Sequence, residues 1–268
     1  MPSARTGEIE LDYERSGSGP PLLLIMGMSG TRRHWGEPFL DALRSEFEVI
    51  AYDHRGVGGS SPLNGSFTIA DLAADALGLL DALEIERAHV LGISMGGMVA
   101  QELALARPSL PIGLTLGCTY CGGPGGALAG EDVMSTLGQA MASRDRERAV
   151  RAAWEVNVSA AFADDREAWE RFREIGMSGG VPLAVLIEQM KAISEHDTSA
   201  RLHELSTPTL VLHGTADRML PVENGRVIAG LIPDSRLEIM DGIGHLFFWE
   251  RPAQAAALVR EHAAVNAQ

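Results

Sequence analysis

The stretch that decides the fold is AHVLGISMGGMVAQELALA, residues 88–106. Its first part, Ala88–Ile93, is an apolar run typical of a buried parallel strand, and Met95–Ala106 has the pattern of a helix. Between them lies GISMG, residues 92–96, a G-x-S-x-G sequence in the strand-turn-helix setting that a nucleophilic serine requires. Such a sharp turn presents the Ser94 hydroxyl outward from a strained backbone, and glycine on both sides avoids collisions. The same five letters also occur in turns without chemistry, so the assignment depends on their surroundings.

Short apolar runs alternate with longer amphipathic stretches on both sides of this motif. This alternation predicts βα units on a parallel sheet. We expect further strands at Glu8–Arg15, Pro21–Met26, Phe47–Tyr52, Ile112–Leu116, Thr209–His213 and Ser235–Met240, and further helices at Arg33–Ser45, Ile69–Leu83, Val222–Leu231 and Pro252–Val265.

One interval breaks the alternation. Only helical patterns occur from about Glu131 to Glu195, after a glycine-rich breaker. The simplest organisation is an α/β core interrupted by an insertion. We expect residues 1–121 and 203–268 to form the core and residues 122–202 to form a helical cap, or lid.

The composition narrows the class of protein. Hydrophobic residues make up 46% and charged residues 22% of the 268 residues, as in globular proteins. The net charge of −14 argues against binding to nucleic acid or to an anionic membrane, because both need basic surface. The N-terminus lacks the apolar run of a secretory signal, and the longest apolar runs are too short to span a bilayer. We therefore expect a cytoplasmic protein.

A serine hydroxyl is a weak nucleophile and needs a base. Among the eight histidines, His245 lies in the loop between the last expected strand and the last expected helix. Active-site groups of open α/β sheets gather at the carboxyl ends of the strands, which makes His245 the candidate base. Three other histidines are expected to be structural from their positions in strands and a terminal helix: His89, His213 and His262.

The base needs a carboxylate to orient it. Asp217 follows the preceding expected strand and therefore lies on the adjacent loop at the same edge of the sheet. Asp241 is a competitor, but it precedes His245 on the same loop and would have to fold back. The order Ser94, Asp217, His245 is the one found in α/β-hydrolases.

A tetrahedral intermediate also needs an oxyanion hole. Two backbone N–H groups usually provide it, one from the residue after the nucleophile and one from the loop after an earlier strand. These are Met95 and, in the loop of residues 26–30, Met28. Taken alone, that loop could equally be an ordinary glycine turn.

Together these segments resemble the α/β-hydrolase superfamily, in its branch of small-molecule esterases, lactonases and peroxidase-like enzymes. Residues 22–27 resemble the family's oxyanion strand, with Met26 where many members carry histidine. Residues 53–60 resemble its D-x-R-G-x-G-x-S segment, residues 208–217 its acid-bearing strand, and Gly244-His245 its histidine loop. The resemblance covers nearly the whole chain. It implies a mostly parallel, doubly wound sheet with a helical lid inserted after the sixth strand. Members with this look include aclacinomycin methylesterase-like, enol-lactonase-like and cofactor-free peroxidase-like enzymes.

Other residues have less specific roles. The D-x-R-G-x-G-x-S segment is expected to brace the nucleophile loop. Cys118 and Cys121 have C-x-x-C spacing, but glycines and a proline follow them, and no further zinc ligands at a compatible spacing are obvious. We expect them to be small packing residues. The candidate pocket residues are His34, Trp35, Tyr120 and Leu246.

These features predict a serine hydrolase that cleaves a small carboxylic ester or lactone through an acyl-enzyme. It would need no metal and no organic cofactor, and its partner would be the small-molecule substrate. The oligomeric state is open, and a homodimer is one alternative.

The same residues would also serve a C–C bond hydrolase, a thioesterase or a perhydrolase. An aminopeptidase is disfavoured, because no lid carboxylate can be assigned to a substrate amine from the sequence. Ser94 in place of aspartate counts against dehalogenase and epoxide hydrolase activity. A ligand-binding protein or a cyclase on the same scaffold is an alternative of another class.

Overall fold

The computed structural model describes residues 2–266 of the chain. Its centre is one sheet of eight strands. The strands are β1 (Ser3–Thr6), β2 (Ile9–Gly17), β3 (Pro21–Ile25), β4 (Glu48–Tyr52), β5 (Ala88–Ile93), β6 (Pro111–Gly117), β7 (Thr209–Gly214) and β8 (Arg236–Met240). Their order across the sheet is β1-β2-β4-β3-β5-β6-β7-β8. All the expected strands occur, and β1 is an additional short strand that the apolar pattern did not predict.

The sheet is mostly parallel. β2 pairs antiparallel with β1 and with β4, and the remaining pairs are parallel. Because β3, β5, β6, β7 and β8 run in one direction, the loops that follow them meet at one edge of the sheet. This edge receives Ser94, Asp217 and His245.

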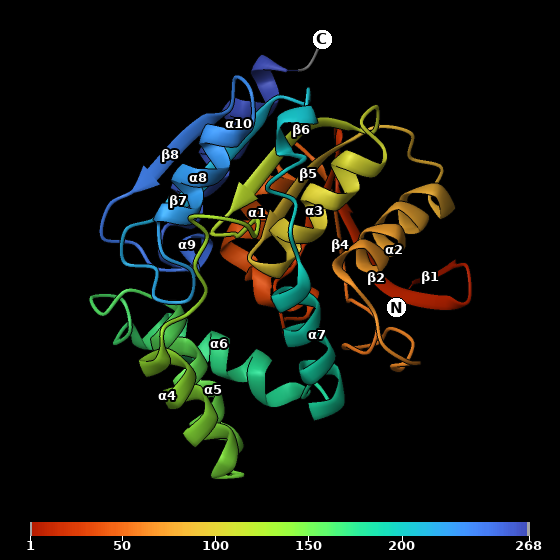
Figure 1. The fold of residues 1–268 in the computed structure, drawn as a ribbon. Coiled ribbons are helices and arrows are strands. Elements are labelled where there is room, and N and C mark those ends of the chain that lie inside the picture. The colour runs from red at the N-terminus through yellow and green to blue at the C-terminus, as the bar shows by residue number, and fades with distance from the viewer. Residues whose placement is uncertain (1, 267–268) are drawn as a thin grey trace.

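Helices cover both faces of the sheet (Figure 1). One layer holds α2 (Ile69–Ala82), α3 (Met95–Ala106) and α8 (Glu223–Leu231), and the other holds α1 (Glu37–Arg44), α9 (Phe247–Glu250) and α10 (Pro252–Val265). Side chains of β3 alternate between the two layers, since Leu23 packs with the first and Leu24 with the second. The sheet is therefore buried on both faces, which explains the continuous apolar runs of its central strands.

Four helices occupy the interval between β6 and β7. They are α4 (Glu131–Ala142), α5 (Arg146–Asn157), α6 (Arg166–Ser178) and α7 (Leu183–Glu195). They form a group on one side of the sheet, below it in the view of Figure 1. We call these four helices the cap. The expected lid after the sixth strand is confirmed, whereas the boundaries at residues 122 and 202 stay a prediction.

The expected helix at 33–45 is interrupted. A 3-10 helix, η1 (Arg32–Trp35), precedes α1, and Gly36 between them has φ 73°. That left-handed conformation favours glycine and cannot continue a helix. A second 3-10 helix, η2 (Leu202–Glu204), follows the cap.

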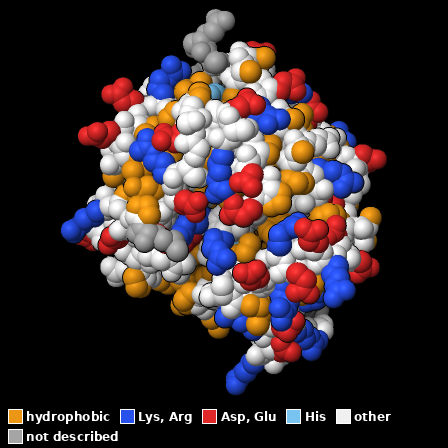
Figure 2. All heavy atoms as spheres, turned by 180° about the vertical axis from the view of Figure 1, so that it is seen from behind, with side chains coloured by type: hydrophobic (Ala, Val, Ile, Leu, Met, Phe, Trp, Pro, Cys, Tyr) orange, Lys and Arg blue, Asp and Glu red, His pale blue; other side chains and the backbone are white. Residues whose placement is uncertain are grey.

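The surface carries both signs of charge. On the face in Figure 2, acidic and basic side chains are interspersed with apolar ones. Among the helices of residues 2–266, none is long and apolar enough to cross a membrane.

Candidate active site

Ser94 lies in a strained turn between β5 and α3. It has φ 56° and ψ −124°, a conformation that is unfavourable for a residue with a side chain. Two hydrogen bonds hold it: Ser94 N donates to Gly117 O at 2.9 Å, and Thr119 Oγ1 donates to Ser94 O at 2.7 Å. Ser94 is partly exposed, whereas its neighbours Ile93 and Met95 are buried. The hydroxyl is thus presented outward from a fixed backbone.

The two flanking glycines are required by close backbone contacts. A Cβ on Gly92 would lie 2.1 Å from Gly96 O, and a Cβ on Gly96 would lie 2.0 Å from Ile25 O. Backbone atoms cannot move aside as a side chain can, so larger residues would distort the turn. This explains the G-x-S-x-G pattern as a packing requirement of the turn.

The loop after β3 lies directly against the serine. A Cβ on Gly27 would be 3.1 Å from Ser94 Cβ and 3.6 Å from Ser94 Oγ. Met28 follows in that loop, and Met95 is the first residue of α3, whose N–H has no acceptor within the helix. The two expected oxyanion donors therefore belong to backbone segments on either side of Ser94.

His245 is paired with Asp217. The distance between His245 Nδ1 and Asp217 Oδ2 is 2.7 Å, and both side chains are buried. The other carboxylate oxygen, Oδ1, accepts hydrogen bonds from the backbone N–H groups of Met219 and Leu220 at 2.8 and 2.9 Å. These bonds fix the carboxylate so that one oxygen faces the imidazole.

The electrostatics favour an ionised acid. Burial by itself raises the pKa of Asp217, but the neighbouring His245 and His213 outweigh it and hold that pKa well below its usual range. An ionised Asp217 accepts a hydrogen bond from the Nδ1–H of His245, which leaves Nε2 as the free basic nitrogen. Within residues 2–266 no hydrogen bond joins Ser94 to His245. Hydrogen bonds between a nucleophile and its base tighten when substrate binds.

The other acid considered, Asp241, does not face His245. It is exposed, and its Oδ1 accepts a hydrogen bond from Thr215 Oγ1 at 3.1 Å. The structure therefore pairs the imidazole with the acid expected from the sequence.

The three histidines that were expected to be structural are buried and contact other parts of the core. His89 and His262 lie beside Gly113, and His262 Nε2 is 3.1 Å from Pro208 O. His213 is fully buried, and its Nε2 is 2.8 Å from Leu220 O and 3.4 Å from Asp217 Oδ2. His213 thus contacts two residues of the loop that carries Asp217 and helps to hold that loop in place. Its position at the end of a strand did not predict this role.

Cys118 and Cys121 are buried free thiols. Burial raises the pKa of Cys121 to about 11 and the pKa of Cys118 well above its usual value. Possible metal ligand atoms of Cys118, Asp217 and His245 lie within 4.8 Å of one another, so two partners for Cys118 exist that the sequence spacing did not reveal. The protonated thiol and the existing His245–Asp217 hydrogen bond both disfavour metal binding.

The four candidate pocket residues lie in different surroundings. Trp35 is fully buried and packs on Phe248, with ring centroids 4.8 Å apart. Packing in the core therefore explains a tryptophan at this position without a contact to substrate. His34 is partly exposed, and Tyr120 and Leu246 are partly buried near the ends of β6 and β8. Their contact with substrate stays a prediction.

The D-x-R-G-x-G-x-S segment braces a different loop from the one expected. Asp53 Oδ1 accepts from Arg32 N at 2.7 Å, and His54 Nε2 is 2.9 Å from Met26 O. Arg32 also forms buried ion pairs with Asp53 and Asp12, at 2.6 and 2.8 Å. These bonds go to the loop after β3, so the segment supports the oxyanion side of the site.

Two polar side chains that sequence reasoning missed connect the site to the cap. Gln189 on α7 accepts a hydrogen bond from Ser29 N at 3.0 Å. Glu250 on α9 is buried and accepts from Gly244 N at 2.8 Å and from Ser159 Oγ at 2.5 Å. Neither position belongs to a motif, and only the fold brings these partners together.

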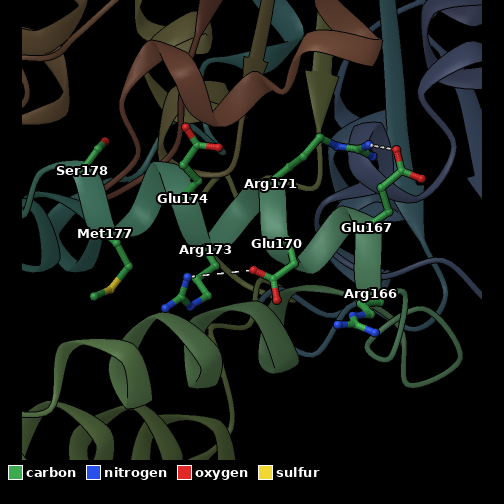
Figure 3. A pocket seen from close by; sticks show the side chains of 8 residues that line it. All are labelled: Arg166, Glu167, Glu170, Arg171, Arg173, Glu174, Met177 and Ser178. Atoms are coloured by element: carbon green, nitrogen blue, oxygen red, sulfur yellow. Dashed lines mark hydrogen bonds and ion pairs between the residues drawn. The ribbon is translucent and has the colours of Figure 1, made fainter.

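A separate hollow runs along α6 (Figure 3). Its lining is largely charged, and oppositely charged side chains pair there, as Arg171 does with Glu167 at 2.5 Å. None of Ser94, Asp217 and His245 lines it. It is therefore a surface groove distinct from the candidate active site.

The sequence and the structure of this chain were compared with those of known proteins to identify its family. The sequence model of the alpha/beta hydrolase fold matches residues 20–252. A relative from Azorhizobium caulinodans, whose name places it among carbamate hydrolases (RutD), is 30% identical over 248 residues and 92% of each chain. The structure of a hydrolase from Pseudomonas aeruginosa is 31% identical, with a TM-score of 0.82 over 97% of this chain and 96% of that one. The enol-lactonase of Burkholderia xenovorans is 25% identical, with a TM-score of 0.84 over 98% of this chain and 100% of its own. The chain belongs to the α/β-hydrolase family and is an enzyme of that fold.

Proposed function

We propose that this enzyme is a serine hydrolase that cleaves a small carboxylic ester or lactone, with Ser94, His245 and Asp217 as its catalytic residues. The observation that carries the proposal is the strained turn that presents Ser94 at the sheet edge shared with the His245–Asp217 pair. Backbone strain at a serine between buried neighbours is costly and is typical of functional sites.

The first half of the reaction forms an acyl-enzyme. Ser94 Oγ adds to the carbonyl carbon of the substrate while its proton moves to His245 Nε2. The carbonyl electron pair moves onto oxygen, and the backbone N–H groups of Met28 and Met95 bind the resulting oxyanion. When the intermediate collapses, the bond to the alcohol breaks, and the alcohol takes the proton from His245.

The second half returns the enzyme to its starting state. His245 Nε2 removes a proton from water, which attacks the acyl carbon. The carboxylic acid leaves, and the proton returns to Ser94. Asp217 stays ionised throughout, because its pKa is low, and it stabilises the imidazolium formed in both halves. All of these steps proceed with side chains and backbone of this chain and need no cofactor.

Relatives support an activated carbonyl as the target. The structurally similar protein from Burkholderia xenovorans is an enol-lactonase, and an enol-lactone is a cyclic ester. A carbamate, which the name of the Azorhizobium caulinodans relative specifies, also offers a carbonyl carbon to a serine nucleophile. Thioester, C–C bond and perhydrolysis chemistry would use the same three residues, so these substrates belong in the test.

The test begins with the reactivity of Ser94. Purified protein is incubated with a fluorophosphonate serine probe, and the adduct is located by mass spectrometry. We expect the label on Ser94, and we expect both Ser94→Ala and His245→Ala to abolish it. Turnover is then measured with matched ester, lactone, carbamate, thioester and C–C bond substrates, and perhydrolysis is measured with an ester in the presence of hydrogen peroxide.

Two results would contradict the proposal. A folded wild-type protein that does not react with the probe has no activated serine, and ligand-binding or cyclase assays would follow. A labelled protein that turns over only C–C or thioester substrates would keep the catalytic residues and reject the ester or lactone assignment.

A further inference from the structure

Gln189 is a polar residue in a position that packing alone would fill with an apolar one. It lies on α7 between Val185 and Ala192, and all three are buried. Their spacing of three and four residues puts them on one face of the helix, the face turned to the core. A buried amide at its centre is unfavourable unless both of its polar atoms are satisfied.

Only half of this amide is satisfied within the protein. Gln189 Oε1 accepts the hydrogen bond from Ser29 N at 3.0 Å, whereas Gln189 Nε2 is buried and has no partner in the described part of the chain. The orientation of the amide is determined, because Ser29 N–H is a donor and must face an oxygen. Nε2 is therefore an unpaired donor that is enclosed by the protein and held in a fixed direction.

The position of this donor is tied to the reaction centre. Ser29 is two residues from Gly27, which lies against Ser94, so the amide sits beside the expected oxyanion loop. The helix is also fixed there, since a Cβ on Gly56 would come within 2.6 Å of Val185 Cγ2. Gln189 thus reaches from the cap to the loop that carries Met28, the expected oxyanion donor.

The sheet order indicates which part of a substrate Gln189 faces. β3 flanks β5 on one side, and β7 and β8, which carry Asp217 and His245, lie beyond its other side. The leaving alcohol must face His245 to receive its proton, so a donor on the β3 side faces the remainder of the substrate, which is its carbonyl and acyl part. Gln189, bonded to the loop after β3, is on that side and away from the leaving alcohol.

We propose that Gln189 Nε2 donates a hydrogen bond to a second oxygen in the acyl group of the substrate, which makes the enzyme selective for oxygen-bearing acyl esters or lactones over plain alkyl ones. The inference rests on the proposed function, since it assumes attack by Ser94. Gln189 acts on specificity, and the chemical step remains with the residues already described.

A pair of isosteric substrates tests this directly. The p-nitrophenyl esters of methoxyacetate and butanoate differ by one oxygen in place of one methylene in the acyl chain. The measured quantity is the ratio of kcat/KM for the two esters, compared between variants so that their different intrinsic reactivity cancels. We expect Gln189→Leu to lower this ratio about tenfold, as for the loss of one hydrogen bond.

Gln189→Glu separates the two roles of the amide. An ionised glutamate keeps an oxygen acceptor for Ser29 N but has no donor, so at alkaline pH, where this buried carboxyl is ionised, the ratio should fall as it does in Gln189→Leu. Gln139→Leu, an exposed glutamine of the cap, is the matched control and should leave the ratio unchanged.

The outcomes distinguish this inference from the proposed function. If Ser94 is labelled by the probe in all variants and the ratio stays the same, Gln189 only holds the oxyanion loop and the inference is wrong. If Gln189→Leu lowers the ratio but Gln189→Glu does not, the donor role is likewise rejected. If wild-type Ser94 is not labelled, the proposed function fails and this inference fails with it.

Discussion

The sheet and the cap differ in how tightly their apolar side chains are held. β5 and β7 are buried along their whole length, as are most residues of β3 and β6. By contrast, large exposed apolar side chains concentrate in residues 128–190: Leu128, Met134, Met141, Met177, Leu183, Ile187 and Met190, with Val265 the other such residue in the described chain. The reacting groups are therefore held by the part of the molecule that can least move, and the cap is the part that can change at low cost.

Several polar contacts join the two regions, and some of them reach the loops of the site. Gln189 connects α7 to the loop after β3, and Glu250 connects Ser159, which lies between α5 and α6, to the backbone beside His245. Leu246 N also donates to Asn157 O at 2.9 Å. The cap thus contacts the site on both sides of Ser94, and this is the route by which a change in the cap would reach the chemistry.

The strongest test of the role of the sheet is Ser94→Ala. Removal of the nucleophile should lower kcat for an ester by about 10⁴–10⁶-fold, because the oxyanion donors alone give only a residual rate. The free energy of unfolding should stay equal or rise, since alanine removes no bond made by the hydroxyl in the fold. Kinetics and thermal unfolding of the same sample check both points. A variant that keeps most of its activity would show that the reaction does not use this serine.

Asp217→Asn should have the next largest effect. The amide cannot hold His245 in its Nδ1–H tautomer, so kcat should fall by about 10³–10⁴-fold. Ser94, the residue that the probe labels, is still present in this variant. Wild type should also be more stable than the variant above about pH 4, where the Asp217 carboxylate would be ionised even in the unfolded chain. Because the pKa of Asp217 is lowered by folding, this advantage should shrink as the pH falls below that value. Urea unfolding of both proteins between pH 3 and 7 measures the difference in their free energies of unfolding. A difference that grows toward acid pH would contradict the lowered pKa of Asp217.

The sequence predicted the sheet and the site better than it predicted the cap, for a physical reason. Each of Ser94, Asp217 and His245 follows a strand, and parallel strands bring their carboxyl ends together whatever the connecting helices do. Their proximity thus follows from their positions directly after parallel strands, which the apolar pattern reveals.

The contacts that were missed depend on tertiary packing across long sequence distances. Gln189 meets Ser29 across 160 residues, and Glu250 meets Ser159 across 91 residues. A glutamine in a helix and a glutamate beside aromatic residues look like surface positions in a sequence. Helical periodicity places Gln189 on the same face of α7 as two apolar residues that turn to the core. Periodicity does not identify Ser29 as its hydrogen-bond partner.

Trp154→Ala probes the centre of the cap. The ring is fully buried, packs against Phe172 with centroids 5.1 Å apart and against Trp249 at 5.8 Å, and donates from Nε1 to Ala163 O at 2.9 Å. We expect a loss of about 3–5 kcal/mol in the stability of the cap, with the sheet less affected. Hydrogen exchange should show faster opening of α5 and α6 than of β5. Equal acceleration in both regions would mean that cap and sheet unfold together.

The smallest effect is expected on the outer face of the cap. Ile187 is 54% exposed on α7, two residues before Gln189 and on the opposite side of the helix. Ile187→Ser should change the free energy of unfolding by no more than about 0.5 kcal/mol, as for most surface substitutions. Leu91→Ala in β5, which removes a fully buried side chain, should cost about 2–5 kcal/mol in the same urea titration. A large loss in Ile187→Ser would mean that this face is covered in solution, and a dependence of that loss on protein concentration would identify a second copy of the chain as the cover. An equally small loss at every protein concentration would leave the outer face of the cap as the region most free to vary.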